Sequence, residues 1–491
     1  MLTRDGSLAP NAASPAAVSR TTSTQPVLKR SAARTPPEQE HRPNILLITT
    51  DDQNAYDMRW MPKTRRLLGG SGMTFTSALS PHPLCCPARA AILTGQYAQN
   101  NGVRHNHGRY GGYKRLHVRD TVASWLDEAG YRTAFVGKFL NEYDAPYPRP
   151  PGWTIWNPML KNWYSYFGTT FYTPEPGDAR YSVDVVGDRT ADYIRRLAPG
   201  RQPFFIWSSQ VAPHAEPIGP GRWGPPPVPP RYRGGLDSAI APALSGPVLN
   251  VPGAAAGGLV GDSGMWSRAY IQRYLAKRIG TLRAVDAAVA RALRALEAVG
   301  ELRNTYVFFA SDNGYLLGEH GLVGKNVLYK ESLEIPMLVR GPGVPRGSRS
   351  SVPVTLVDLA PTFMRIAGAR AGARQDGTSL LPVLHGNQVS WRDTQLVQTG
   401  SRRLNSVFPG WAYRGVRTDR YTFARDIGSG RIVLFDRRRD PNELHDVAGV
   451  PAYAAIRHEL ARRTRLLSTC AGDLCNRRFG DPGEPSQLSE R

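Results

Sequence analysis

Acidic side chains that could bind a cation occur in two pairs far apart in the sequence. Asp51 and Asp52 directly follow one apolar run, and Asp312 and Asn313 follow another. Three carboxylates and an amide form an oxygen-only ligand set, which suits a hard divalent cation. Zinc is disfavoured, because neither histidine nor cysteine accompanies these residues. An aspartate pair after a strand can also be a helix N-cap with a solvated charge, so the hypothesis requires the two pairs to meet.

A candidate nucleophile lies in the pattern C-x-P-x-R-x-x-x-L-T-G, which begins at Cys85. Pro87 suits the first turn of a helix, and residues 88–93 include good helix formers. Cys85 is therefore expected at a helix N-terminus, where free N–H groups and the helix dipole favour an anionic nucleophile. The competing interpretation is a buried cysteine pair, Cys85 and Cys86, with Arg89 in a salt bridge.

Basic side chains stand beside the same turns. Arg89, Lys138, Lys325 and His214 could stabilise negative charge that develops on the oxygens of an ester during its cleavage. Histidine is the natural proton donor to a leaving oxygen near neutral pH. A lone lysine is usually a solvated surface charge, so the candidacy of Lys325 depends on its spacing after Asp312.

Apolar runs of strand length precede these polar clusters. They cover 44–50, 131–136, 203–208, 305–310 and 336–339. Such runs fit strands buried on both faces of a parallel sheet. Open α/β sheets bind ligands beyond the carboxyl ends of their strands, so we expect the polar clusters to converge there.

Helical segments alternate with the strands. The spacing predicts a helix over 121–129 that ends at Gly130, and a long helix over 266–299 that stops at Gly300. This alternation indicates an α/β fold with a large, mostly parallel sheet flanked by helices. The Pro/Gly-rich segment 216–264 is predicted to be a long loop.

The length of 491 residues allows a large domain and a smaller one. Residues 1–42 are poor in large apolar side chains and are predicted to be a disordered extension. The catalytic domain is expected at 43–395, followed by a smaller α+β subdomain at 396–491. Antiparallel strands within 411–435 and a closing helix at 452–467 are predicted in that subdomain.

The net charge of +22, from 62 basic and 40 acidic residues, would attract anionic substrates. Arginine spread over the whole surface explains the charge equally well. No Lys/Arg run with interleaved aromatic residues supports nucleic-acid binding. No stretch approaches the roughly 18 uninterrupted apolar residues of a membrane span.

Cys470 and Cys475 are close enough in sequence to form a small disulfide loop. A disulfide would imply an oxidising compartment, and we favour it over two inert thiols. A C-x4-C pair alone lacks the second ligand pair that a zinc site needs. The N-terminal segment contains no apolar h-region of a Sec signal peptide. The possible disulfide is therefore the only feature from which we expect a secreted or extracytoplasmic location.

With these residues the chain resembles the type I, formylglycine-dependent sulfatases of the alkaline-phosphatase-like superfamily. The resemblance covers roughly residues 43–450. The matching segments are C-x-P-x-R from Cys85, I-T-T-D-D-Q at 48–53, A-P-H at 212–214 and S-D-N-G at 311–314. Three more segments look like scaffold signatures of the family: V-D-L-A-P-T at 357–362, D-G-T-S-L-L-P at 376–382 and L-F-D-R-R-R-D-P-N-E at 434–443.

Within this family the chain is most similar to the N-acetylglucosamine-6-sulfatase group. The similarity rests on G-K-F-L-N-E-Y at 137–143, P-P-G-W at 150–153, Y-S-V-D at 181–184 and G-E-L-R-N-T-Y at 300–306. It implies a sulfated amino sugar or glycan as substrate, with an aryl sulfate as the alternative.

The resemblance also implies a role for each site residue. A formylglycine-generating enzyme would oxidise Cys85 to formylglycine. One hydroxyl of the hydrated aldehyde would attack sulfur, and the second would then expel sulfate, which serine or cysteine cannot do. The implied metal is one Ca2+, bound by Asp51, Asp52, Asp312, Asn313 and the modified Cys85. Arg89 and Lys138 would hold the hydrated aldehyde, while His214 and Lys325 would hold the sulfate, with His214 also assisting the leaving group.

Two residues depart from the common family pattern. Many sulfatases carry G-K-W-H, but the position of that histidine is Leu140 here, and His320, His105 or His107 could replace it. Ala88 stands where serine is common, which should leave conversion of Cys85 unaffected.

Two alternative functions remain open. One is a phosphodiesterase or phosphonate monoester hydrolase that uses the same machinery. The other is a non-catalytic protein that binds sulfated glycans, which would keep an intact thiol at Cys85.

Overall fold

The computed structural model describes residues 42–486, apart from 162, 221, 235–247, 253–259 and 402–409. Of the predicted N-terminal extension, only Arg42 lies among the described residues.

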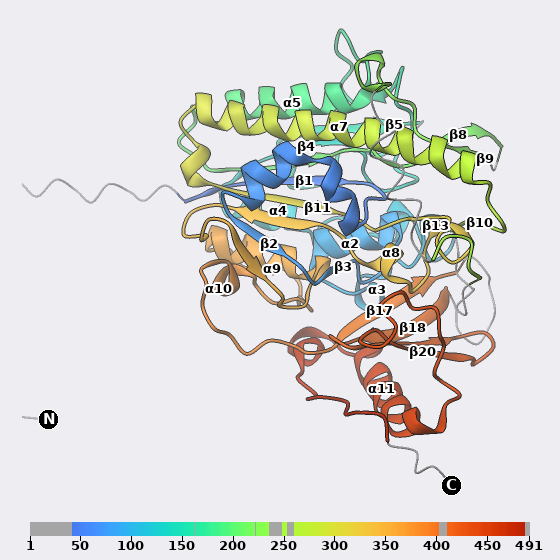
Figure 1. Ribbon diagram of the computed structural model, residues 1–491. Helices are drawn as coiled ribbons and strands as arrows, with labels where there is room; N and C mark the ends of the chain where they lie inside the picture. Colours follow the sequence, from blue (N-terminus) through green and yellow to red (C-terminus); the bar gives the residue numbers. More distant parts are fainter. Residues whose placement is uncertain are drawn as a thin grey trace, which may run out of the picture. The chain divides into compact units, whose positions relative to one another are not determined.

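A nine-stranded mixed sheet positions the polar clusters (Figure 1). Its five central strands are parallel, and the edge strands are mostly antiparallel to their neighbours. In spatial order the strands are β15 (Ser348–Ser350), β2 (Met73–Phe75), β14 (Met337–Arg340), β11 (Thr305–Ser311), β1 (Asn44–Thr50), β7 (Phe204–Ser209), β4 (Arg132–Gly137), β5 (Ile155–Leu160) and β6 (Thr170–Phe171). The predicted α/β fold with a mostly parallel sheet is confirmed.

Strand β1 shows why the central strands are continuous apolar runs. All seven of its residues are buried, because helices cover both faces of the sheet. Ile45 and Leu47 belong to one hydrophobic core, and Leu46 and Ile48 belong to the other. Helices α5 (Ser182–Leu197) and α7 (Arg268–Ala298) cover one face, and α2 (Cys85–Thr94), α4 (Val122–Glu128) and α9 (Leu359–Ala367) cover the opposite face (Figure 1).

The predicted helices at 121–129 and 266–299 are present as α4 and α7. Ser267 caps α7 by accepting a hydrogen bond from the backbone N–H of Tyr270. The prediction of one long loop over 216–264 was wrong in part. Strands β8 (Glu216–Gly219) and β9 (Arg222–Gly224) form a hairpin there, and β10 (Val260–Ser263) pairs with β13 (Leu322–Lys325), a tertiary contact that Pro/Gly composition does not reveal.

A four-stranded antiparallel sheet follows the large sheet in the chain and confirms the predicted C-terminal α+β part. It consists of β17 (Gln395–Gly400), β18 (Trp411–Arg417), β19 (Tyr421–Asp426) and β20 (Ile432–Asp436). Helix α11 (Ala454–Leu467) packs against β18 and β19. The sequence did not predict β17, and the domain boundary at 395 stays a prediction. The remaining short elements include α1 (Pro62–Thr64), α3 (Ala98–Asn101), α8 (Lys330–Leu333), α10 (Leu381–Leu384), β3 (Ala78–Leu79), β12 (Leu316–Leu317) and β16 (Val354–Thr355).

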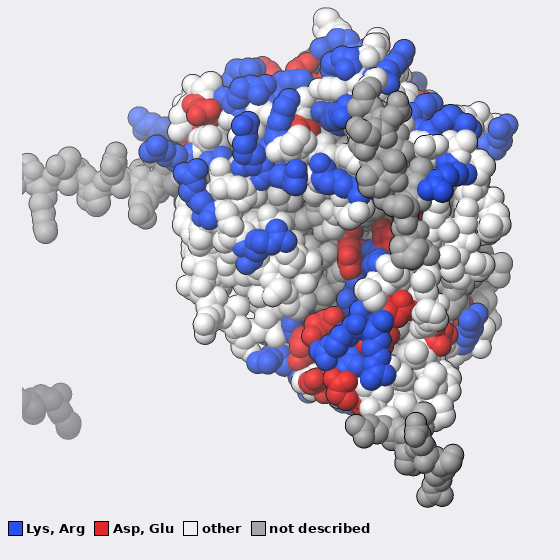
Figure 2. Space-filling model, in the orientation of Figure 1, with Lys and Arg blue, Asp and Glu red and all other residues white. Residues whose placement is uncertain are grey.

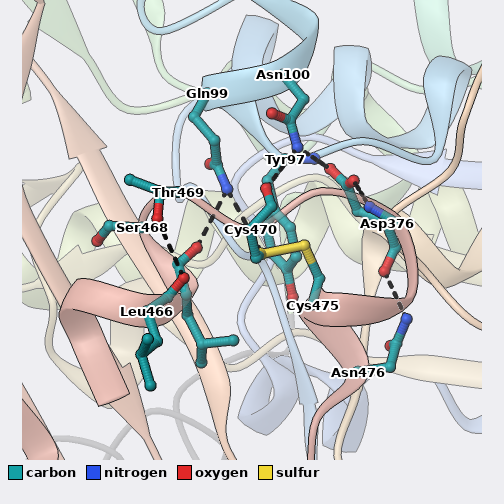
Figure 3. The surroundings of a disulfide bond; sticks show 12 residues. Tyr97, Gln99, Asn100, Asp376, Leu466, Ser468, Thr469, Cys470, Cys475 and Asn476 are labelled. Carbon is teal, nitrogen blue, oxygen red and sulfur yellow. Dashed lines mark hydrogen bonds between the residues drawn. A yellow bond between two sulfur atoms is a disulfide. The ribbon is translucent and has the colours of Figure 1, made fainter. Parts of the chain in front are cut away.

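The predicted disulfide between Cys470 and Cys475 is present (Figure 3). Asn100 Nδ2 donates hydrogen bonds to the carbonyl of Cys470 and to Asp376. The Asp376 carboxylate also accepts hydrogen bonds from the backbone N–H groups of Tyr97 and Gly472. Asp376 is the first residue of the D-G-T-S-L-L-P segment. Through these hydrogen bonds, this scaffold signature connects the disulfide loop with Tyr97, which follows α2.

Basic side chains are spread over the surface in the region of α7 (Figure 2). Exposed members on that helix include Arg273, Lys277 and Arg294. Within the described part of the chain, no helix is both long enough and apolar enough to cross a membrane.

Candidate active site

The carboxyl ends of four adjacent strands bring the predicted polar clusters together. Backbone hydrogen bonds continue beyond the strands, from Asp312 N to Thr50 O (3.1 Å) and from Lys138 N to Ser209 O (2.9 Å). A third joins Asp51 N to Ala212 O (3.2 Å), next to the segment that carries His214. The order β11, β1, β7, β4 therefore places these clusters beside one another.

Cys85 lies at the centre of this group. Helix α2 begins at Cys85, and Leu84 at its N-cap provides no side-chain hydrogen bond. The Cys85 Sγ atom lies 3.0 Å from Lys325 Nζ, 3.4 Å from Lys138 Nζ and 3.4 Å from Asp51 Oδ1. Two cations and a helix N-terminus thus converge on one buried sulfur atom.

Asp52 and Asn313 connect the two acidic turns. Asp52 has a left-handed backbone with φ +67°, an unusual conformation for a residue other than glycine. Its backbone N–H donates to Asp312 Oδ1 (3.2 Å), and its Oδ1 accepts from Asn313 Nδ2 (2.7 Å). Lys325 Nζ also contacts Asp52 Oδ1. The strained turn therefore directs the Asp52 side chain toward the 312–313 turn.

Arg89 bridges the candidate metal ligands. Its Nε donates to Asp312 Oδ2 (2.9 Å), and its Nη2 donates to Asp51 Oδ2 (3.3 Å). Its Nη1 donates to Ser209 Oγ (2.6 Å) and to the carbonyl of Lys138 (2.7 Å). The alternative to a nucleophile at Cys85 was a buried cysteine pair with Arg89 in a salt bridge. Arg89 does form a salt bridge, but its partners are the two acidic turns, so it belongs to the same site.

Burial and charge oppose each other at this site. Burial alone would raise the pKa of Asp51, but the charge of Lys138, followed by those of other nearby cations such as Lys325 and Arg89, lowers it well below its usual range. Burial, followed by the Asp51 charge, raises the pKa of Asp312 to about 6. At Lys325, the nearby carboxylates outweigh burial and raise the pKa, so the ammonium group stays charged.

The donor set fits a hard divalent cation. Asp52 Oδ2 and Asn313 Oδ1 are buried and accept no hydrogen bond from the described residues, so both have lone pairs available to an ion. The sequence argument against zinc was wrong in one respect. Ligand atoms of Cys85 and His214 lie with those of Asp51 and Asp52, all within 4.8 Å of one another. This contact joins segments that are far apart in sequence.

His214 is held by a backbone carbonyl and an aromatic ring. Its Nδ1 lies 2.6 Å from Ala215 O, and its ring stacks on Tyr164 at a centroid distance of 4.2 Å. Because a carbonyl only accepts, Nδ1 carries a proton, and Nε2 is directed toward Asp52 Oδ2 at 3.4 Å. Burial lowers the pKa of His214 to about 3, so the isolated ring is neutral at pH 7.

A small cavity of about 120 Å3 opens beside His214 and Lys325. His105 and His107 line this cavity together with Asp52, Tyr164 and other residues. His320 lies elsewhere, because its ring stacks on Tyr329 at 3.8 Å. The full lining consists of Asp52, His105, Asn106, His107, Tyr164, His214, Ala215, Trp223, Asp262, Tyr270, Tyr274, Tyr315, Val323 and Lys325.

The sequence analysis missed three residues that shape this site. Tyr164 stacks on His214, Trp223 packs edge-on against Tyr164 at 5.0 Å, and Asn141 Nδ2 donates to the Tyr164 hydroxyl (2.7 Å). The aromatic run at 163–167 was the available indication for Tyr164. No local pattern marked Trp223, which lies on the unpredicted strand β9.

His320 belongs to a separate cluster with two glutamates. Its Nε2 lies 3.5 Å from Glu331 Oε2. The Glu319 carboxylate accepts a hydrogen bond from the backbone N–H of Leu317. Burial, followed by the charge of Glu331, raises the pKa of Glu319 to about 7, from about 4.5 in the unfolded chain.

The Glu319→Gln variant is expected to be more stable than the unmodified protein at pH 8. The folded protein holds the Glu319 proton more tightly than the unfolded chain does, so ionisation destabilises the fold progressively as pH rises from about 4.5 to about 7. Glutamine keeps an oxygen for Leu317 N and avoids this loss. Melting temperatures should differ by a few degrees at pH 8 and converge at pH 4.5. Glu297→Gln, an exposed change on α7, is the matched control; equal behaviour of both variants would contradict the prediction.

Two family models match the chain. The model described as "Sulfatase" covers residues 43–369, and the model described as "N-sulphoglucosamine sulphohydrolase, C-terminal" covers 318–469.

Several curated relatives are sulfatases. The human N-acetylglucosamine-6-sulfatase is 35% identical over 392 residues, which covers 75% of this chain and 69% of the human protein. The Capra hircus enzyme of the same name is 31% identical over 495 residues, covering 90% of this chain and 86% of the goat protein. An extracellular sulfatase of Caenorhabditis elegans, a Sulf-1 homolog, is 34% identical, but the chain spans only 52% of its length.

Solved structures share the fold. A protein in complex with its substrate D-glucosamine-2-N,6-O-disulfate has a TM-score of 0.68 at 23% identity, covering 86% of this chain and 97% of that chain. The phosphonate monoester hydrolase of Agrobacterium radiobacter also has a TM-score of 0.68 at 23% identity, covering 87% and 95%. The chain therefore belongs to the sulfatase family, which confirms the predicted family and the predicted enzyme class, a sulfuric ester hydrolase.

Proposed function

We propose that the protein hydrolyses a sulfate ester on an amino sugar or glycan, with formylglycine formed from Cys85 and one Ca2+ ion. The observation that carries the proposal is the surroundings of Cys85 Sγ, where Lys138, Lys325 and Asp51 lie within 3.4 Å at the start of α2. The human and goat N-acetylglucosamine-6-sulfatases support an amino sugar 6-sulfate as the substrate.

The unmodified thiol of Cys85 is poorly suited to act as the nucleophile itself. Burial, followed by the Asp51 charge, raises the pKa of the Cys85 thiol to about 11. The thiolate is the nucleophilic form of cysteine, so an unmodified Cys85 would be almost entirely unreactive at pH 7. A hydrated aldehyde at this position provides hydroxyl groups that can contact the same lysines.

The charged residues have separate tasks in this proposal. Lys138 and Lys325 both lie within 3.4 Å of Cys85 Sγ and stabilise negative charge on the oxygens of the reacting sulfate. Arg89 holds Asp51 and Asp312 in place through its hydrogen bonds. Calcium, held by Asp51, Asp52, Asp312 and Asn313, would supply positive charge beside the nucleophile.

We assign His107 and His214 to the side of the site from which the leaving oxygen departs, because both line the cavity beside Lys325. Neutral His214 presents an unprotonated Nε2, because its Nδ1 proton is bonded to Ala215 O. His107 lies in the same cavity and is only partly buried. Its Nδ1 lies 3.5 Å from Glu142 Oε1, and its Nε2 lies 3.3 Å from Asn141 Nδ2.

The disulfide and the extracellular relatives support a secreted or extracytoplasmic location. Disulfides persist in oxidising compartments, and Cys470–Cys475 is one. The curated Sulf-1 homologs of Caenorhabditis elegans and Drosophila melanogaster are named as extracellular sulfatases.

Rates on paired substrates test the proposed reaction. We expect kcat/KM for 4-nitrophenyl sulfate to exceed that for bis(4-nitrophenyl) phosphate by at least about 100-fold, or about 2.7 kcal/mol. A sulfate monoester presents three terminal oxygens to Lys138, Lys325 and the calcium, whereas a phosphate diester presents two, because its second ester group occupies the third position. Sulfate release from N-acetylglucosamine 6-sulfate, measured alongside, tests the sugar. A preference for the diester would instead favour a phosphodiesterase or phosphonate monoester hydrolase.

A further inference from the structure

One carboxylate in the active-site cavity takes no part in the proposed chemistry. Asp262 lines the cavity together with Asp52 and Lys325, but it lies on β10, outside the turns that surround Cys85. Its side chain is exposed, and across the described ranges its carboxylate forms neither a hydrogen bond nor a salt bridge. The lysine of the cavity, Lys325, contacts Asp52 instead. Asp262 therefore adds a negative charge to the cavity that no bonded cation neutralises.

The pairing of β10 with β13 places Asp262 on the side of the reaction centre. In this antiparallel pair Asp262 lies opposite Val323, and Lys325 follows two positions later on β13. Directly opposed side chains share a face of the sheet, and so do side chains two positions apart on one strand. Asp262, Val323 and Lys325 therefore share one face, and all three line the cavity. The β carbons of diagonal neighbours such as Asp262 and Lys325 lie about 7–8 Å apart, a distance that one monosaccharide can span.

The residues around Asp262 hold it at the cavity wall. Tyr270, in the first turn of α7, lines the same cavity. Burial, followed by the charge of Asp262, raises the pKa of Tyr270, so the carboxylate lies near the Tyr270 hydroxyl. Between these two residues, Trp266 N donates to Asn250 Oδ1 (3.0 Å), and Asn250 Nδ2 donates to the Trp266 carbonyl (2.8 Å). The position of Asp262 is thus fixed by β13 on one side and by the segment that leads into α7 on the other.

The rest of the cavity wall is poor in positive charge. Lys325 is the only lysine among the described residues that line it, and no arginine lies among them. This lining contrasts with the chain as a whole, which has a net charge of +22. Five aromatic side chains, which suit the apolar faces of a sugar, line the cavity: Tyr164, Trp223, Tyr270, Tyr274 and Tyr315. The described lining can therefore take one sulfate group at Lys325, but it offers no second lysine or arginine to another anionic group.

We propose that Asp262 selects the amino sugar, because it favours an N-acetylated 6-sulfate over one that carries a second sulfate on nitrogen. A carboxylate that is not neutralised raises the free energy of an anionic group placed beside it, whereas a neutral acetamide is little affected. Specificity that arises from repulsion of the wrong substrate requires no additional contact with the right one. The inference rests on the proposed function, because it distinguishes two substrates of the same active site.

Binding to an inactive protein tests the inference separately from turnover. Full-length Cys85→Ala protein, which cannot form formylglycine, is titrated by calorimetry in the presence of Ca2+. The two sugars are N-acetylglucosamine 6-sulfate and glucosamine-2-N,6-O-disulfate, and we expect the N-acetylated sugar to bind about tenfold more tightly or better. Adding Asp262→Asn removes the charge and should strengthen binding of the disulfate in particular, so the ratio of the two affinities should fall to about threefold or less.

Two control variants make the result specific. Asp262→Glu keeps the negative charge and should keep the preference for the N-acetylated sugar. Asp127→Asn removes an exposed charge from α4 that forms no ion pair within the described part of the chain, and the ratio should stay within about twofold of its original value. The ratio is a safe readout because partial unfolding of a variant lowers the amount of competent protein equally for both sugars. An unchanged ratio in Asp262→Asn would overturn the proposal, as would tighter binding of the disulfate by the Cys85→Ala protein.

Turnover by protein with native Cys85 is measured alongside. Sulfate release from N-acetylglucosamine 6-sulfate should have a higher kcat/KM than release from the disulfate, and Asp262→Asn should reduce this difference. Absence of sulfate release from both sugars and from 4-nitrophenyl sulfate would count against the proposed function alone, because the calorimetry does not depend on turnover.

Discussion

Replacing Cys85 with serine is expected to abolish multiple turnover while the protein remains folded. We expect kcat for sulfate release to fall at least about 1000-fold, or about 4 kcal/mol. Serine fills the same space at the start of α2, but it has a single hydroxyl and cannot release sulfate by the second hydroxyl of a hydrated aldehyde. Steady-state sulfate release and thermal melting would be measured on both proteins.

Peptide mass spectrometry of the protein without substitutions should show the Cys85 peptide with the mass of an aldehyde in place of a thiol. The control variant is Cys86→Ser, since Cys86 is also buried and accepts a hydrogen bond from Asn141 N at 3.1 Å, a contact that serine can keep. Its kcat should stay within about tenfold of that of the unmodified protein. Retained multiple turnover by Cys85→Ser, or an intact thiol in active protein, would refute the mechanism. An intact thiol in protein that releases no sulfate would favour a non-catalytic glycan-binding protein.

The Asp52→Asn substitution is expected to weaken calcium binding at least about 100-fold, or about 2.7 kcal/mol. Asp52 contributes a buried oxygen that accepts no hydrogen bond from the described residues, and asparagine keeps one oxygen but removes the negative charge that favours the ion. Calorimetric titration of chelator-treated protein measures the affinity directly. In the unmodified protein, calcium should also raise the melting temperature, because it binds the folded state.

Asp192→Asn provides the matched control for this prediction. Asp192 lies on α5 with a side chain 53% exposed, far in sequence from either acidic turn, so calcium affinity should be unchanged. Unchanged affinity in Asp52→Asn would remove Asp52 from the ligand set. Tight binding of Zn2+ with no response to Ca2+ would show that Cys85 and His214 determine the metal instead of the oxygen donors.

Much of the fold could be predicted because its strands and helix ends are encoded locally. The apolar run at 44–50 became β1 with the same bounds, since helices cover the sheet on both faces and leave no polar position in the strand. Predictions failed where the local pattern is weak. Strand β8 contains Pro217 and Gly219, which favour a loop in the sequence, yet it pairs with β9 as a hairpin.

The sequence by itself determined the family and most of the residues that converge. Cys85, Asp51, Lys138, His214 and Asp312 each follow a strand or begin a helix, and such positions are marked by local changes in residue type.

Only the tertiary structure decided how those side chains meet. Arg89 bridges Asp51 and Asp312, Tyr164 stacks on His214, and Arg104 lies against Trp411. The partners in these contacts are separated by 38 to more than 300 positions, so no periodicity along the chain encodes them. Their physical cause is the order of the strands and the packing of loops onto them, which a single sequence pattern does not contain.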